Sequence, residues 1–277
     1  AYKRLKNTVS DCEDRYDLIE RQIAGLCDEK LLKENIKNSL NGFNYRFTAM
    51  HSRYMIDGYD ENDEAAIEAK LSKIAGIHTY SRALVIDSTL ENIIDAAKEM
   101  CKGKTGFFKV ATNRADKRFF PHSMEVSEIV GGKLLETYHK DLKVRVKDPD
   151  FTVSVDIRED GKTFVYTENI HGIGGMPVGS AGRGMLLISG GIDSPVAGYM
   201  MAKRGMKLDA VHYHSFPYTG EAAKEKVIEL SRLVGEYNGG IRLHVVPFTH
   251  IQETIHEKCH EEYMITMMRR FMMRIAE

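Results

Sequence analysis

A glycine-rich turn directly after an apolar segment is the feature that most constrains this chain. The turn reads SGGIDSP over residues 189–195, follows the apolar residues 185–188 and precedes a predicted helix over 194–204. Glycine lets the backbone turn sharply and approach a ligand closely. We expect Ser194 to be the N-cap of the helix and Pro195 to take its first position. The free N–H groups of such a helix start bind anions, so the turn predicts a phosphate site.

Strands and helices alternate strictly from this turn to the last residues. This order predicts a parallel, doubly wound sheet built from βαβ units. Ligands of such sheets bind at the carboxyl ends of the strands, which is where the turn lies. The predicted strands are 185–188, 207–214 and 241–248, and the predicted helices are 194–204, 221–237 and one from residue 251 onward.

Strands and helices are intermingled in the middle of the chain, as is typical of a compact α+β domain. An acidic run over 60–64 marks a boundary before this domain, and six glycines over 171–184 mark a linker or a flexible substrate-facing loop after it. The predicted helices are 16–40, 64–73, 89–101 and 123–139, and the predicted strands are 45–50, 79–87, 107–112, 143–147, 151–157 and 163–168. The predicted domains are 1–64, 65–169 and 185–277, with a glycine-rich linker over 170–184.

Composition excludes several classes of protein. With 277 residues, 39 basic and 40 acidic side chains and a net charge of −1, the chain is not a globally basic nucleic-acid binder. Its four cysteines show no CxxC spacing, which argues against a disulfide framework and a cysteine-rich zinc site. No apolar run approaches the roughly 20 residues of a membrane span, and no secretory signal is evident. We therefore expect a soluble protein of the cytoplasm without a membrane partner.

The turn differs from the two common glycine-rich nucleotide loops. A Walker A loop requires a lysine, which the turn lacks, and the glycine spacing is not GxGxxG. The hydroxyls of Ser189 and Ser194 suit phosphate oxygens, whereas the carboxylate of Asp193 would repel bare phosphate. We expect Asp193 to hold Mg²⁺. A tight βα turn with a purely structural role stays the alternative.

SGGIDS at this position resembles the PP-loop of the ATP pyrophosphatases. The segments SPVAGYMMAKRG, AVHYHSFPYT, VVPFTHIQETI and YMITMMRRFMMRIAE further resemble the ThiI family of tRNA 4-thiouridine synthetases. Residues 65–169, with FKVATNRADKRFFPHSMEVSEIVGG, resemble the THUMP domain of that family, and the residues before 65 resemble its ferredoxin-like domain. The resemblance implies an α/β and α+β fold: an N-terminal ferredoxin-like region, a THUMP domain and a partial doubly wound parallel sheet.

The resemblance implies the activity of an ATP-dependent tRNA sulfurtransferase. In the family, ATP adenylates the C4 oxygen of uridine 8 in tRNA and releases pyrophosphate, and persulfide sulfur from a cysteine desulfurase then displaces AMP. ATP and Mg²⁺ are the implied cofactors, and a role in thiamine thiazole synthesis implies a sulfur-carrier protein as a further partner. Asp193 is the implied catalytic residue and Mg²⁺ ligand. The implied ATP contacts are Leu187, Ile188, Ser189, Gly190, Gly191, Asp193, Ser194, His212, Tyr213 and Arg269.

A basic stretch lies within the near-neutral chain. Residues 98–147 contain twelve lysines and arginines against six acidic residues. Such a patch suits backbone phosphates and gives salt-dependent affinity, and Phe119 and Phe120 are placed to stack on an unpaired base. The alternative is a solvated surface around two core phenylalanines. The candidate tRNA-binding residues are Lys104, Lys109, Arg114, Lys117 and Arg118.

Two patterns near the carboxyl end have simpler interpretations than the motifs they match. Residues 256–260 read HEKCH, which fits the HExxH zinc pattern, but no third ligand follows convincingly. The methionines of the last predicted helix favour a core-facing stripe, with Arg269 and Arg270 on another face. These methionines are Met264, Met267, Met268, Met272 and Met273.

The sequence departs from the family pattern at both ends. Residues 1–28 match the first strand of the family poorly, so we expect the first region to lack that strand. The last residue, Glu277, falls inside a predicted helix, so we expect a fragment without the family's sulfur-accepting cysteine and with partial ATP binding at best. A tRNA-binding chain without catalysis and another PP-loop adenylating ligase stay open as alternatives, as does a homodimer.

Overall fold

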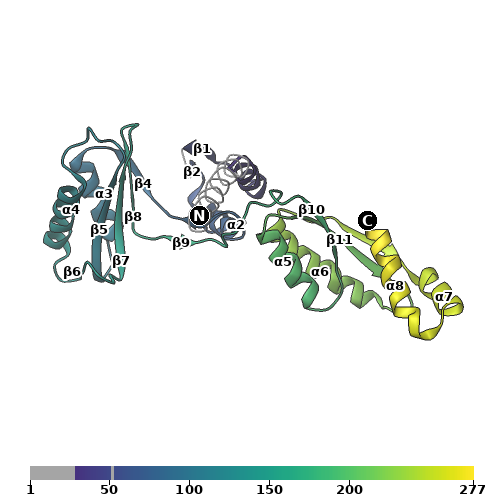
Figure 1. Ribbon diagram of the computed structural model, residues 1–277. Coiled ribbons are helices and arrows are strands. Elements are labelled where there is room, and N and C mark those ends of the chain that lie inside the picture. Colours follow the sequence, from purple (N-terminus) through teal and green to yellow (C-terminus); the bar gives the residue numbers. More distant parts are fainter. Residues whose placement is uncertain (1–28, 51–52) are drawn as a thin grey trace, which may run out of the picture. The chain divides into compact units, whose positions relative to one another are not determined.

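The computed structural model describes residues 29–50 and 53–277, which form two compact units (Figure 1). One unit contains the described residues up to His78 together with His171–Glu277, and the other is Thr79–Ile170. The chain enters the second unit through β3 (Thr79–Tyr80) and leaves it through β9 (Ile170–His171), and these two short strands pair with each other.

The first unit opens with a helix and a β-hairpin. Residues 29–39 are helical, which agrees with the predicted helix over its described part, and Ile36 and Leu40 are buried. The remainder of that prediction, and the expectation that residues 1–28 lack a strand, lie outside the described residues. The predicted strand is β1 (Arg46–Met50), and it pairs antiparallel with β2 (Arg53–Asp57), which the sequence pattern did not indicate.

Acidic residues start the next helices, as the sequence predicts. Asp60 is the N-cap of the short 3₁₀ helix η1 (Glu61–Asp63), and its carboxylate accepts a hydrogen bond from the Asn62 N–H at 2.9 Å. The α-helix α2 (Glu64–Leu71) follows directly and buries Ile67 and Leu71. An acidic side chain at a helix start is favourable because the N-terminal end of the helix dipole is positive.

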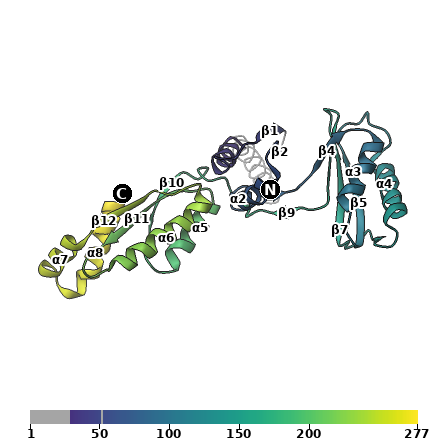
Figure 2. The same ribbon diagram turned by 180° about the vertical axis from the view of Figure 1, so that it is seen from behind.

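The second part of this unit is the predicted parallel sheet. Its strands run in the order β10-β11-β12, and both neighbouring pairs are parallel. The helices α5 and α6, which connect the strands, contact each other and lie side by side in both views (Figures 1 and 2). Ile188, Ala210 and Val227 form the core between sheet and helices. The elements are β10 (Arg183–Leu187), α5 (Asp193–Lys203), β11 (Lys207–His214), α6 (Glu221–Asn238) and β12 (Leu243–Pro247).

The long helix predicted from residue 251 onward is two helices. α7 (Thr249–Lys258) ends at Cys259, whose backbone is extended, and His260 is the N-cap of α8 (Glu261–Ala276). The apolar periodicity continues across this break, so it could not reveal the turn.

The glycine-rich segment 171–184 is packed against both of its neighbours. On one side, Gly76 N–H donates to Gly174 O at 2.9 Å and the Asn35 side chain donates to Val178 O at 3.0 Å. On the other, Met176 N–H donates to Lys203 O at 2.9 Å, at the end of α5. The segment is thus held in place by hydrogen bonds from both sides, which argues against a flexible loop.

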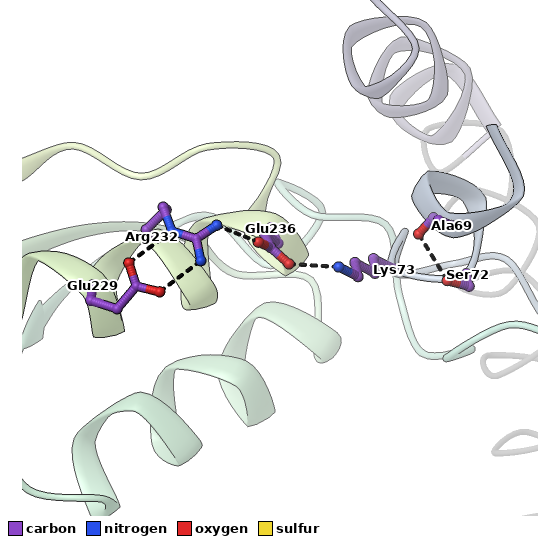
Figure 3. Close-up of polar contacts among 6 residues, drawn as sticks. All are labelled: Ala69, Ser72, Lys73, Glu229, Arg232 and Glu236. Atoms are coloured by element: carbon purple, nitrogen blue, oxygen red, sulfur yellow. Dashed lines mark hydrogen bonds and ion pairs between the residues drawn. The ribbon is translucent and has the colours of Figure 1, made fainter. Parts of the chain in front are cut away.

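An ion-pair chain adds to this connection (Figure 3). Lys73, just after α2, lies 2.6 Å from a Glu236 carboxylate oxygen on α6. Glu236 also pairs with Arg232 at 2.8 Å, and Arg232 pairs in turn with Glu229 at 2.7 Å. These groups are partly exposed, so each pair adds little stability, and the chain of pairs links the residue after the end of α2 and its C-cap to α6.

The second unit is a five-stranded sheet with two helices on one face (Figures 1 and 2). Its strands run in the order β4-β8-β7-β5-β6, and β5 and β7 are parallel neighbours. The core lies between this sheet and α3 and α4, around the fully buried Phe108. The elements are β4 (Leu84–Asp87), α3 (Leu90–Cys101), β5 (Gly106–Arg114), α4 (Ser123–Tyr138), β6 (Leu142–Val144), β7 (Phe151–Ile157) and β8 (Lys162–Tyr166).

Most element predictions in this unit hold, with two differences. Thr89 caps α3, as expected, by accepting a hydrogen bond from the Asn92 N–H at 3.2 Å. The predicted strand 79–87 is broken between β3 and β4, and the predicted strand 143–147 is shortened to β6, which ends before the turn at Asp148 with its φ of +49°. Neither predicted strand contains a glycine or proline that would indicate where the observed strand ends.

Candidate functional site

The glycine turn lies at the carboxyl end of β10, as expected for a ligand site of a parallel sheet. Ile188, directly after β10, is 3% exposed, and its N–H donates to Val211 O at 2.9 Å. Ser189 and Gly191 are exposed, so the chain leaves the core at this point. Leu187 is half-buried at the strand end. The turn from Ser189 to Ser194, called the loop below, therefore has its backbone open to solvent.

Ser194 closes the loop rather than capping the helix. Its hydroxyl accepts a hydrogen bond from the Ser189 N–H at 3.1 Å. α5 begins at Asp193, with Ile192 as N-cap, so the predictions of Ser194 as N-cap and Pro195 as first helical residue are wrong. No side chain caps the helix start. The Asp193 and Ser194 N–H groups at this helix start are therefore left for a ligand, which is the arrangement that binds anions, whereas the Val196 N–H donates to Ile192 O at 3.4 Å.

Asp193 is exposed at the first position of α5. Within the described ranges 29–50 and 53–277 its carboxylate makes no hydrogen bond or ion pair, and no group of three or more potential metal ligands occurs there. Mg²⁺ commonly binds through one or two carboxylates and completes its shell with water and substrate phosphates. A single carboxylate beside an anion-binding loop fits Mg²⁺ held together with a phosphate ligand.

Two histidines share one face of β11 at its carboxyl end. His212 is 8% exposed, and its Nδ1 lies 3.2 Å from Ile188 O, directly before the loop. The His214 ring lies 6.1 Å from the His212 ring, between centroids. The Nε2 atoms of both rings are buried without a hydrogen-bond partner, and the Glu221 carboxylate at 3.6 Å from His214 is too far for one. An unsatisfied buried polar atom costs about 1–3 kcal/mol, which a ligand would offset.

Tyr213 faces the other side of the sheet and holds α8. Its hydroxyl donates to the carbonyl oxygen of Met272, and its ring packs edge-on against Phe248 with centroids 5.2 Å apart. Burial raises the pKa of the phenol. Arg269, exposed on α8, precedes Met272 by about one helical turn, so this contact ties the helix that carries Arg269 to the end of β11.

A lysine that no sequence motif indicated lies beside the loop. The side chain of Lys226 on α6 approaches Gly190 so closely that a Cβ added to Gly190 would lie 3.8 Å from Lys226 Cδ. No motif includes it because α5 and β11 separate it from the loop in sequence. Only the parallel crossover, which packs α6 beside α5, brings them together.

In the second unit, half of the basic residues in 98–147 are already paired with acids. Among the predicted tRNA contacts, Lys104 lies 2.8 Å from Glu168 and Arg118 lies 3.0 Å from Asp116. Hydrogen bonds from Arg118 hold the pKa of the Asp116 carboxyl below its usual range. The paired residues are Lys98, Lys102, Lys104, Arg118, Lys133 and Arg145.

The other predicted contacts differ in what they offer a ligand. Arg114 donates to the carbonyl oxygen of Phe119, whereas the Lys109 and Lys117 side chains have no hydrogen bond or ion pair within residues 79–170. Lys109 lies on the sheet face opposite the helices, because its neighbours Phe108 and Val110 point into the core. Phe119 packs against that core, while Phe120 is 76% exposed and remains available for stacking.

The HExxH pattern and the methionine stripe near the carboxyl end both differ in the structure from what the sequence pattern indicates. His256 lies in α7 and His260 precedes α8, so the HExxH residues do not share one helix. The predicted methionine stripe is only half-buried, since Met264, Met267, Met268 and Met272 are partly covered and Met273 is 61% exposed. Cys101 and Cys259 are free thiols, and Cys12 and Cys27 lie outside the described residues.

Three family models match successive parts of the chain. A ferredoxin-like domain of ThiI matches residues 29–81, a THUMP domain matches 87–168, and the thiamine biosynthesis protein ThiI matches 179–277. Two of these three models are ThiI models, so the chain is similar to ThiI over residues 29–81 and 179–277. The ThiI match covers the loop and the histidine strand, and the THUMP match covers the unit with the basic stretch.

Several known proteins are similar to this chain along most of its length. A probable tRNA sulfurtransferase of Clostridium kluyveri is 45% identical over 249 residues, which cover 90% of this chain and 64% of the relative. A probable tRNA sulfurtransferase of Acetivibrio thermocellus is 46% identical over 258 residues, which cover 90% of this chain and 64% of that relative. The crystal structure of a 4-thiouridine synthetase–RNA complex with bound ATP has a TM-score of 0.83 at 33% identity and covers 91% of this chain and 65% of its own.

This chain therefore spans about two thirds of the length of its curated relatives. The similarity confirms the predicted fold class, in which a ferredoxin-like region and a THUMP domain accompany a parallel sheet. No helix within the described ranges is long and apolar enough to span a bilayer.

Proposed function

We propose that this chain acts in ATP-dependent tRNA sulfur transfer, with ATP bound at the loop and tRNA held by the second unit. The observation that carries the proposal is the uncapped start of α5 beside the unpartnered His212 Nε2, at the carboxyl ends of two parallel strands. The solved 4-thiouridine synthetase, similar over 91% of this chain, was crystallised with RNA and ATP. Its similarity supports both substrates.

The proposed nucleotide contacts divide between the strand ends and the loop. Leu187, Ile188, His212 and Tyr213 lie where β10 and β11 end, and they suit the adenosine part. The loop residues Ser189, Gly190, Gly191 and Ser194 suit the phosphates, because the loop leads into a helix start that no side chain caps. Arg269 on α8 adds a positive charge from the other side of β11.

We propose adenylation of uridine 8 as the first reaction. The C4 oxygen of the uracil attacks the α-phosphorus of ATP, the bond from that phosphorus to the β-phosphate oxygen breaks, and pyrophosphate leaves. The loop's N–H groups stabilise the charge that develops on the leaving group, and the site positions both reactants. Mg²⁺, which Asp193 would hold, supplies charge neutralisation of the phosphates when bound.

The second reaction replaces AMP with sulfur at C4. We propose that a cysteine desulfurase delivers this sulfur as a persulfide, whose terminal sulfur attacks C4 and displaces AMP. A thiol then attacks the resulting disulfide, which breaks the S–S bond, releases 4-thiouridine and leaves a disulfide between the two thiol sulfurs. A sulfur-carrier protein of thiazole synthesis is proposed as a second acceptor. Both reactions take place, in this proposal, in the cytoplasm, where tRNA is available.

The second unit suits RNA through its free cations and one exposed ring. Lys109 and Lys117 can contact phosphates because neither is neutralised by an acid within this unit. Phe120 offers a flat apolar face on which an unpaired base can stack. A surface of this kind binds single-stranded or end regions of RNA better than a helix interior.

The experiment that tests the proposal measures 4-thiouridine in tRNA. The protein is incubated with tRNA, ATP, Mg²⁺, cysteine and a cysteine desulfurase, and the digested tRNA is analysed by mass spectrometry, with ATP omitted as the control. ATP-dependent 4-thiouridine supports the proposal. Tight tRNA binding without thiolation favours a binding chain without catalysis, and ATP–pyrophosphate exchange that ignores tRNA favours another PP-loop ligase.

A further inference from the structure

The loop has a lysine beside it although its own sequence has none. Lys226 lies in the second turn of α6, which begins at Glu221. Its Cδ would be 3.8 Å from a Cβ on Gly190, so its alkyl chain lies beside Gly190 of the loop. The ammonium group lies two bonds beyond Cδ, and the flexible lysine stem lets it reach a phosphate held by the loop.

The other cations of α6 are neutralised, whereas Lys226 is not. Lys224 pairs with Glu221 at 3.0 Å, and Arg232 pairs with both Glu229 and Glu236. Lys226 makes no hydrogen bond or ion pair within the described residues of its unit. No carboxylate among these residues therefore neutralises it at the edge of the loop.

The loop needs such a charge if it binds a triphosphate. Its own ionisable side chain is the carboxylate of Asp193, which repels phosphate in the absence of a cation. Backbone N–H groups carry only partial positive charge. Lys226 supplies the whole charge that Walker A loops obtain from a lysine inside the motif.

We propose that Lys226 binds the terminal phosphates of the nucleotide at the loop and stabilises the departing pyrophosphate. This inference rests on the proposed function and adds a residue to it that lies outside the motif. Gly190 lies in the loop itself, beyond the strand ends that suit the adenosine. Lys226 thus acts on the β- and γ-phosphates and leaves AMP largely unaffected.

The test compares the binding of ATP, AMP and pyrophosphate by calorimetry in the presence of Mg²⁺. In Lys226→Met we expect affinity for ATP and pyrophosphate to fall about tenfold, equivalent to about 1.4 kcal/mol, while AMP affinity changes less than about twofold. Lys226→Arg keeps the charge and is expected to stay within about threefold of wild type for all three ligands. Lys224→Met is the matched control on the same helix and is expected to bind all three like wild type.

The outcomes separate this inference from the proposed function. If Lys226→Met binds ATP and pyrophosphate as tightly as the wild-type protein does, the role of Lys226 is overturned and the proposed function stands. An equal loss for AMP also overturns it, since the lysine then only supports the fold of the site. Absence of ATP binding to the wild-type protein overturns the proposed function, and the role of Lys226 with it.

Discussion

Single residues of this protein differ sharply in reactivity, and Cys101 is the clearest case. Burial at the end of α3 raises the pKa of its thiol to about 11. Because the thiolate is the reactive form, about a thousandth of this thiol is ionised at pH 8. We expect iodoacetamide to leave Cys101 unmodified in the native protein at pH 8 and to modify it after unfolding, as measured by peptide mass spectrometry.

Cys259 is the internal control for this prediction. It is half-buried, at the break between α7 and α8, and we expect it to be alkylated in the native protein. Reactivity of Cys101 should rise only as the pH approaches 11, since its pKa lies above the ordinary value. Labelling of Cys101 at the rate of Cys259 at pH 8 contradicts the burial described here.

At the residue scale, the sequence located the loop but not the contacts of its side chains. The glycines and serines of SGGIDS predicted a turn between a strand and a helix, and the turn lies there between β10 and α5 because their spacing is a local signal. Anion binding by this loop stays a prediction. The role of Ser194 depended on whether its hydroxyl turned to its own helix or back to Ser189, and the sequence contains nothing that decides this. Lys226 could not be assigned, since its position follows from the packing of α6. The proposed ATP and tRNA contacts stay predictions.

At the scale of elements, the core of the second unit depends on Phe108 of β5. Its side chain is fully buried and its ring stacks on Phe151 with centroids 6.0 Å apart. Truncation of a buried phenylalanine costs about 3–5 kcal/mol, so Phe108→Ala should lower the free energy of unfolding of this unit by that amount. Urea denaturation followed by circular dichroism measures it.

Phe120→Ala is the matched control in the same unit. Its ring is 76% exposed, so we expect a change of less than about 0.5 kcal/mol in the same titration. Equal destabilisation by the two substitutions would mean that Phe120 belongs to the core and is not available to a base.

The glycine-rich linker gives a second prediction at this scale. Gly175 has a φ of +81°, and a Cβ there would lie 2.2 Å from the Lys203 carbonyl oxygen. Gly182 has a similar φ of +84° but open space around it. Both alanine variants adopt a left-handed backbone, which costs about 1–2 kcal/mol of stability. Any further loss of stability in Gly175→Ala therefore measures the clash with α5. Thermal unfolding of the two variants shows the difference, and equal melting temperatures contradict the packed linker.

The elements themselves could be predicted where a local signal marked both ends. Thr89 indicated the start of α3, and the acidic residues in 60–64 indicated the start of α2. No glycine or proline marks the break between α7 and α8 or the gap between β3 and β4. The sequence pattern therefore predicted one continuous element at each of these places. β2 was missed because RYMID lacks the alternation of a half-buried strand. The predicted domain boundaries stay predictions.

At the scale of the whole molecule, RNA binding should depend on salt through a small number of cations. Neutralised lysines release few counterions, so the effective contacts are fewer than the basic stretch suggests. We expect Lys109→Gln and Lys117→Gln each to reduce the slope of log affinity for tRNA against log salt by about one. Filter binding at several salt concentrations measures this slope, with Lys102→Gln, already paired with Glu99, as the control. A slope that none of the three changes argues against the proposed contacts.

In the proposed function, nucleotide and tRNA are bound by different units of one chain. The most direct test of this division is to titrate MgATP and tRNA separately into two variants, Asp193→Ala and the double variant Lys109→Glu with Lys117→Glu. We predict that Asp193→Ala loses about tenfold in ATP affinity and keeps its tRNA affinity. We predict that the double variant loses tRNA affinity and keeps its ATP affinity. A variant that weakens both ligands alike, or an unchanged ATP affinity in Asp193→Ala, contradicts the division.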